Sequence, residues 1–354
     1  QASKARGIGR NPCFSSSNQP IERSSPQGRP AAPGRMPAEG EAAKGHEPSR
    51  WGCGLAAVLL GVAGSLGLLL LARNFAHDGG AAAPALTAQL IELKPKSDNR
   101  QYHFSRLSNG IQVVNVHDPK ALSDAYSMAI EAGSLDDLEN FPGLAHFCEH
   151  MLFLGTEGYP ASAAYDEFVK LKGGYLNAYT ADETTVYYSE LSKGSLSEAF
   201  DRFGDFFRAP RFNDSLVGKE IHAIDSEHAK NVQDPTWRLF ALFNALANPE
   251  SPVSRFHTGD LETLYTAPRK AGSDPVVALK SWFDAHYCPS RMHLVTFGST
   301  PLAEQLEKAE KYLGNISSKA PSCDREAPRS WSEPAPWPEE RLGQWVSVRG
   351  TTPD

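Results

Sequence analysis

Cysteine is scarce in this sequence. The chain has 354 residues and only five cysteines, with no Cys-x-x-Cys pair among them: Cys13, Cys53, Cys148, Cys288 and Cys323. Disulfide-stapled domains and cysteine-ligated zinc sites need several cysteines at short, regular spacing. We therefore expect neither a disulfide framework nor a cysteine zinc site. A chain of this length can form a hydrophobic core without such staples.

An excess of basic charge is also missing outside the N-terminus. The formal net charge is −7, but residues 1–50 hold eight Lys or Arg against four Asp or Glu, so the rest of the chain carries −11. Proteins that bind nucleic acids present basic surfaces to the phosphates. The acidic body therefore argues against a nucleic-acid partner.

Large apolar side chains are few in residues 1–50, where 20 of the 50 residues are Pro, Gly or Ser. Such a composition buries too little apolar surface to offset the entropy of ordering the chain. We predict a disordered, basic head over this range.

A single long uncharged segment follows at residues 51–72 (WGCGLAAVLLGVAGSLGLLLLA). A helix of about 20 residues crosses a bilayer core of about 30 Å, so the segment predicts a transmembrane or signal-anchor helix. Lys44 and Arg50 precede it, whereas only Arg73 follows closely. By the positive-inside rule we expect a single-pass protein with a cytoplasmic N-terminus and a lumenal or extracellular body.

A cleaved leader is the alternative for the same segment. Residues 81–83 are three alanines, which suit a cleavage site. The protein would then be targeted to an organelle or secreted after removal of the leader. In either case residues 73–100, with Gly79-Gly80 inside them, are expected to form a tether.

The pattern of a folded domain begins near residue 101. Short β-branched and aromatic runs occur in pairs, and amphipathic helical stretches follow one another in runs. This grouping predicts an α+β fold, a two-layer domain in which a mostly antiparallel sheet packs against helices. We place this domain at residues 101–317. Residues 318–354, rich in Pro, Ser and Glu, are expected to be a linker and the truncated start of a second domain.

The chemistry concentrates in the segment His146-Phe147-Cys148-Glu149-His150. Histidines four residues apart lie on one face of a helix, where two imidazoles can chelate one metal ion. Glu149 is near enough on that helix to take a proton from a water at the metal. Zinc accepts imidazole and carboxylate ligands and can leave one position open for water. Glu220 and Glu227, two turns apart on a predicted helix over 216–231, are candidates for a third ligand.

The motif His-x-x-Glu-His is that of inverted zinc peptidases. Residues 143–156 (GLAHFCEHMLFLGT), 177–180 (NAYT) and 225–231 (DSEHAKN) closely resemble the pitrilysin family of metallopeptidases, especially its insulysin and nardilysin group. The resemblance extends over about residues 100–315. It implies a fold like the first domain of these enzymes.

The resemblance also implies roles for individual residues. His146, His150 and Glu227 would ligate one Zn2+ per chain, Glu149 would be the catalytic general base, and Glu220 would complete the catalytic set by supporting the metal site. An extended peptide substrate would pair with the strand that carries the substrate-binding residues Asn177, Ala178 and Tyr179.

Two functions follow as hypotheses. The first is a zinc metalloendopeptidase whose sequence here is the N-terminal part of a larger enzyme, and this fragment need not be active by itself. The second is a non-catalytic zinc- and peptide-binding fragment or partner subunit. It arises because enzymes of this family close a chamber from two halves. A missing C-terminal half, or a partner chain, is then expected to complete the chamber.

Overall fold

A computed structural model of the chain describes residues 94–320, 323, 334–337 and 339–347. The predicted disordered head, the apolar segment 51–72, most of the tether and parts of residues 318–354 lie outside these ranges. Among the described residues, no helix combines the length and apolar character needed to cross a membrane. The membrane segment and the orientation derived from it stay predictions.

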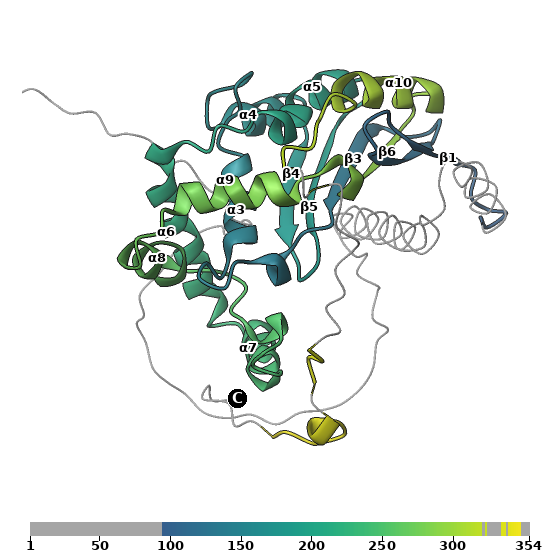
Figure 1. Cartoon of the computed structure of the whole chain (residues 1–354). Helices are drawn as coiled ribbons and strands as arrows, with labels where there is room; N and C mark the ends of the chain where they lie inside the picture. The colour runs from purple at the N-terminus through teal and green to yellow at the C-terminus, as the bar shows by residue number, and fades with distance from the viewer. Residues whose placement is uncertain (1–93, 321–322, 324–333, 338, 348–354) are drawn as a thin grey trace, which may run out of the picture. The chain divides into compact units, whose positions relative to one another are not determined.

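A six-stranded mixed sheet forms the centre of the domain (Figure 1). The strand order is β1-β2-β6-β3-β5-β4, so β4 lies at one edge. Four of the five pairings are antiparallel, and only β2 and β6 run parallel. The expected α+β class with a mostly antiparallel sheet is confirmed. The strands are β1 (Gln101–Arg106), β2 (Gln112–His117), β3 (Ser123–Ile130), β4 (Tyr175–Thr180), β5 (Thr185–Ser192) and β6 (Met292–Gly298).

Most of the described helices agree with the runs predicted from the sequence, whereas the short α8 was not predicted. Three of them begin where an Asn or Asp side chain accepts a hydrogen bond from the first-turn backbone, which is the usual signal for a helix start. The helices are α3 (Leu144–Leu152), α4 (Ala164–Leu171), α5 (Leu196–Arg208), α6 (Asp214–Asn231), α7 (Pro235–Leu246), α8 (Ala267–Lys270), α9 (Pro275–His286) and α10 (Leu302–Leu313).

The core lies between one face of the sheet and the helices. Alternate residues of β3, namely Tyr126, Met128 and Ile130, are buried in this core, as the two-residue period of a strand requires. Helix α3 packs against β4, β5, α6 and α9 (Figure 1). The helix that carries the His-x-x-Glu-His motif is therefore held on several sides.

One cysteine pair corrects the expectation from the sequence. Cys288 and Cys323 form a disulfide, with their Cα atoms 5.7 Å apart, whereas Cys148 is a buried free thiol. The pair is 35 residues apart in the chain, and neither cysteine belongs to a short motif. The fold brings them together because the chain after α10 returns to the end of α9. Sequence spacing gives no signal of such a contact.

Candidate metal centre

Helix α3 directs two histidines out of the core. Every residue of this nine-residue helix is buried except His146 and His150, whose side chains are 13% and 14% exposed. The apolar residues on the other sides fix the helix against the sheet. The spacing of four then brings the two rings together, with their Nε2 atoms 3.1 Å apart.

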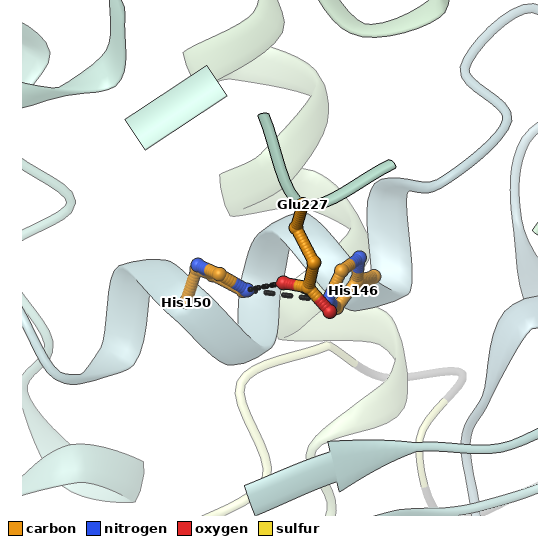
Figure 2. A group of neighbouring side chains, drawn as sticks. All are labelled: His146, His150 and Glu227. Carbon is orange, nitrogen blue, oxygen red and sulfur yellow. Dashed lines mark hydrogen bonds and ion pairs between the residues drawn. The ribbon is translucent and has the colours of Figure 1, made fainter. Parts of the chain in front are cut away.

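Helix α6 supplies a carboxylate to the same point. Oε2 of Glu227 lies 3.9 Å from Nε2 of His146 and 3.6 Å from Nε2 of His150. Figure 2 shows the three side chains converging from α3 and α6. One ligand atom from each residue lies within 4.8 Å of the others, so the three can hold one metal ion.

The outer nitrogens of the two rings already have partners. Nδ1 of His150 lies 2.8 Å from Oε1 of Glu220, and Nδ1 of His146 lies 2.7 Å from the carbonyl oxygen of Thr258. Both partners are acceptors, so each Nδ1 carries a proton, and in the neutral form each ring turns its Nε2 lone pair inward. Two lone pairs facing each other beside a carboxylate require a shared cation. The donor set therefore fits Zn2+.

The charged residues around His150 also favour a cation at this point. Burial lowers the pKa of this imidazole, but Glu220, Glu227 and the charge of Glu149 outweigh burial and raise it to about 10. The pKa of Glu227 is lowered, chiefly by its contact with His150. Three carboxylates thus stabilise positive charge at this point, whether a proton or a metal ion carries it.

Glu149 lies on the same helix and is 7% exposed. Its Oε2 accepts a hydrogen bond of 2.6 Å from Oγ1 of Thr180, the last residue of β4. Thr180 therefore connects the acidic residue of the motif to the strand expected to bind the substrate. The residues alone gave no indication of this contact.

The predicted substrate residues lie on β4 as expected, but on two faces. Leu176 and the partly buried Ala178 face the helices, whereas Asn177 and Tyr179 alternate to the opposite face. Oδ1 of Asn177 accepts the backbone N–H of Ala178 at 2.9 Å.

Two further residues support α3 from outside the motif. The N-cap of the helix is Gly143, which has no side chain to accept hydrogen bonds. Asp137, 4% exposed, accepts the N–H groups of Gly143 and Ala145 at 2.7 Å each and so satisfies donors that a helix start leaves free. Burial raises the pKa of Asp137 to about 7, although these two N–H groups act to lower it.

The second support is a close contact between glycines. Gly143 has a φ of 93°, and a Cβ there would overlap the backbone of Gly259. The contact brings the neighbouring carbonyl of Thr258 to His146. A carbonyl is common to all residue types, so the sequence could not identify this partner.

Comparison with known proteins covers the two helices that carry this site. Residues 112–250, which include α3 and α6, match the family model described as Insulinase (Peptidase family M16). Residues 277–347 match the model described as Peptidase M16 inactive domain. The chain carries M16 (insulinase) family domains. Its M16 region is 39% identical over 226 residues to insulin-degrading enzyme of Homo sapiens, covering 64% of this chain and 22% of that protein.

A second relative and a solved structure extend the comparison. A-factor-processing enzyme of Saccharomyces cerevisiae is 37% identical over 263 residues, covering 74% of this chain and 25% of that protein. The crystal structure of pitrilysin matches with a TM-score of 0.61 and 33% identity, over 64% of this chain and 24% of that one. The M16 region therefore spans about a quarter of the length of these relatives.

Proposed function

We propose that this chain is a zinc-dependent metalloendopeptidase, or the zinc-binding part of one. The observation that carries the proposal is the convergence of His146, His150 and Glu227, with both Nε2 lone pairs directed to one point. Membership of a peptidase family and the likeness to a protein named insulin-degrading enzyme support the same reaction class.

In this proposal Zn2+, when bound, polarises the scissile carbonyl and lowers the pKa of a water. Glu149 accepts the proton of that water and delivers it to the leaving amine. The hydrogen bond from Thr180 holds the Glu149 carboxylate in place. Glu220 fixes the His150 ring through Nδ1 and keeps the lone pair of Nε2 directed inward.

The substrate in this proposal is a peptide in extended conformation. Strand β4 lies at the edge of the sheet, and Thr180 at its end contacts Glu149. A peptide that adds to this edge as a further strand would pass beside the metal centre. Asn177 would then have to release the Ala178 N–H to the peptide, while Tyr179 would contact peptide side chains on the outer face of the sheet.

The experiment is the substitution Glu149→Gln in the full chain. It removes the base but no predicted ligand, so zinc content should stay near one per chain while cleavage of a quenched fluorescent peptide falls about 100- to 10,000-fold. Glu304→Gln is the matched control, since Glu304 lies on α10 and pairs only with Lys308 among its described ion pairs. Undiminished cleavage in Glu149→Gln would contradict the assignment.

A non-catalytic zinc- and peptide-binding subunit is the second candidate. It is favoured by the coverage of the relatives, because about three quarters of their length has no counterpart in this chain. Zinc binding and peptide binding without cleavage by the wild-type chain would establish it. Restored cleavage on adding the remaining part of such an enzyme as a separate chain would assign the completion of the chamber to a partner.

A further inference from the structure

The loop of residues 255–261 contacts each element that carries the metal centre. Towards α3, the Thr258 carbonyl accepts Nδ1–H of His146, and Gly259 packs on Gly143. Towards α6, the Leu261 N–H donates to Oδ1 of Asp225 at 3.1 Å, and the Phe256 ring lies 4.8 Å from the His228 ring. The position of this loop therefore determines the position of the His146 ring.

His257 connects the same loop to the substrate strand. Its Nδ1 lies 3.3 Å from Oδ1 of Asp182, and its Nε2 lies 3.3 Å from the carbonyl oxygen of Pro252. Both ring nitrogens face acceptors, so the doubly protonated imidazolium satisfies both, whereas a neutral ring would turn a lone pair towards one of them. The His257 side chain is 16% exposed and that of Asp182 is 64% exposed.

Asp182 lies in the turn between β4 and β5, two residues after Thr180. This turn is held to the segment before α3, because the N–H groups of Ser134 and Leu135 donate to the carbonyls of Ala181 and Asp182 at 3.0 and 2.9 Å. The turn thus ends the strand that contacts Glu149, and its one described ion pair to the 255–261 loop is made by Asp182.

We propose that His257 is a positioning residue for the metal centre. Its ion pair with Asp182 fixes the 255–261 loop against the β4–β5 turn, and the loop in turn holds the Thr258 carbonyl on Nδ1 of His146. The ring of His146 and strand β4 are thereby held in a fixed position relative to each other. The inference deepens the proposed function and rests on His146 being a ligand.

The charged groups around His257 are consistent with this role. Asp182 faces it from the β4–β5 turn, and Asp137, in the segment before α3, attracts it only in the ionised form, because burial raises the pKa of that carboxyl to about 7. Nη1 of Arg255, on the loop itself, donates to the backbone carbonyl of Asp137 at 3.1 Å. The imidazolium is therefore attracted chiefly from the β4–β5 turn, and Arg255 attaches the loop to the segment before α3.

The first test measures zinc affinity in the full chain by competition with a chelating dye. Direct partners of a ligand contribute about 10- to 100-fold in metal affinity, so a partner one step further should contribute about 3- to 10-fold. We expect that loss in Asp182→Asn and in His257→Gln, no further loss in the double variant, and near-wild-type affinity in Asp182→Glu and in the control Glu304→Gln. Equal affinities in all variants would overturn the proposal.

The second test does not depend on zinc or on cleavage. Hydrogen exchange should accelerate in residues 181–185 and in the 255–261 loop together when Asp182→Asn is compared with Asp182→Glu at pH 6. The difference should vanish at high pH, where His257 is neutral. Acceleration confined to residues 181–185 would overturn the proposal. A wild-type chain that binds no zinc would refute the proposed function, and the exchange measurement would still decide on His257.

Discussion

Helices α3 and α6 both contribute to the metal centre, but the protein holds them differently. Helix α3 has nine residues, all buried except its two histidines, and its start is completed by the distant side chain of Asp137. Helix α6 has 18 residues, buries four of them and is capped by its own neighbour Asn213. The start of α3 therefore depends on a residue outside the helix, whereas α6 is capped by the residue directly before it.

The same contrast applies to the ligands. Each histidine of α3 is fixed through Nδ1 by a second residue, and both rings are nearly buried. The Glu227 side chain on α6 is 43% exposed. A fixed pair of imidazoles with a more exposed carboxylate can accept a metal without rearranging the core. Four predictions test this comparison.

The largest effect should follow the loss of a fixed ligand. His150→Ala should weaken zinc binding by more than about 100-fold, because removing a ligand costs more than removing its hydrogen-bond partner. Glu227→Ala should cost less, since water can enter its exposed position. Chelator competition measures both, with Glu220→Gln, expected to lose about 10- to 100-fold, as reference. Unchanged affinity in Glu227→Ala would remove Glu227 from the set of ligands.

The second-largest difference between α3 and α6 is expected in the stability of their glycine variants. Gly143→Ala combines a positive φ with overlap on Gly259 and should destabilise the fold by about 2–4 kcal/mol. A Cβ at Gly218 on α6 would meet no atom within 4 Å, so Gly218→Ala should stabilise the fold by about 0.5–1 kcal/mol through helix propensity. Urea unfolding gives both values. Equal effects would show that α3 does not depend on the glycine contact.

Removal of the side chains that cap α3 and α6 should give a smaller difference in the free energy of unfolding. Asp137→Ala leaves two N–H groups at a buried helix start without their acceptor and should cost about 2–3 kcal/mol and reduce zinc affinity. Asn213→Ala removes an exposed cap and should cost about 1 kcal/mol with zinc affinity unchanged. Thermal unfolding and chelator competition on the same samples check this. Reduced zinc affinity in Asn213→Ala would contradict the independence of α6.

The smallest effect concerns the ion pair that fixes the 255–261 loop. Burial lowers the pKa of His257, but Asp182 and the Pro252 carbonyl raise it above its usual 6.5, and His257 in turn lowers the pKa of Asp182 below 3.8. The contribution of His257 is complete below pH 6.5 and is lost as the pH rises through its raised pKa. That of Asp182 is complete above pH 3.8 and is lost as the pH falls through its lowered pKa.

The pair should therefore stabilise the fold most between pH 3.8 and 6.5, by about 0.5–1 kcal/mol because it is partly exposed. The difference in unfolding free energy between wild type and Asp182→Asn, measured from pH 5 to 9, should shrink towards pH 9. A difference that grows with pH would show that neutral His257 makes the contact.

Features set by one element were predictable from the sequence. The histidine pair follows from a spacing of four within a helix, and the helix predicted over 216–231 is observed as α6, Asp214–Asn231. The placement of Glu220 and Glu227 on one face of a helix follows from their spacing of two turns. These inferences succeed because the period of a helix fixes local geometry.

Features set by contact between distant segments were not predictable. The Thr258 carbonyl reaches His146 across 112 residues, and Asp182 and His257 are 75 residues apart. His257 has no potential partner at helical spacing, so the sequence assigned it no role. The Cys288–Cys323 disulfide was missed for the same reason. Such contacts depend on how the elements pack, which no local pattern records.

The place of β4 at the edge of the sheet, among the residues that the structure describes, has a consequence for handling the protein. An edge strand with free backbone groups pairs with any extended chain, including a second copy of itself, unless charge or proline blocks it. Within β4 no residue is charged or proline, and Tyr175 and Tyr179 are 43% and 36% exposed. Self-association in concentrated solution should therefore begin at this strand, and a bound peptide should act as a solubilising additive.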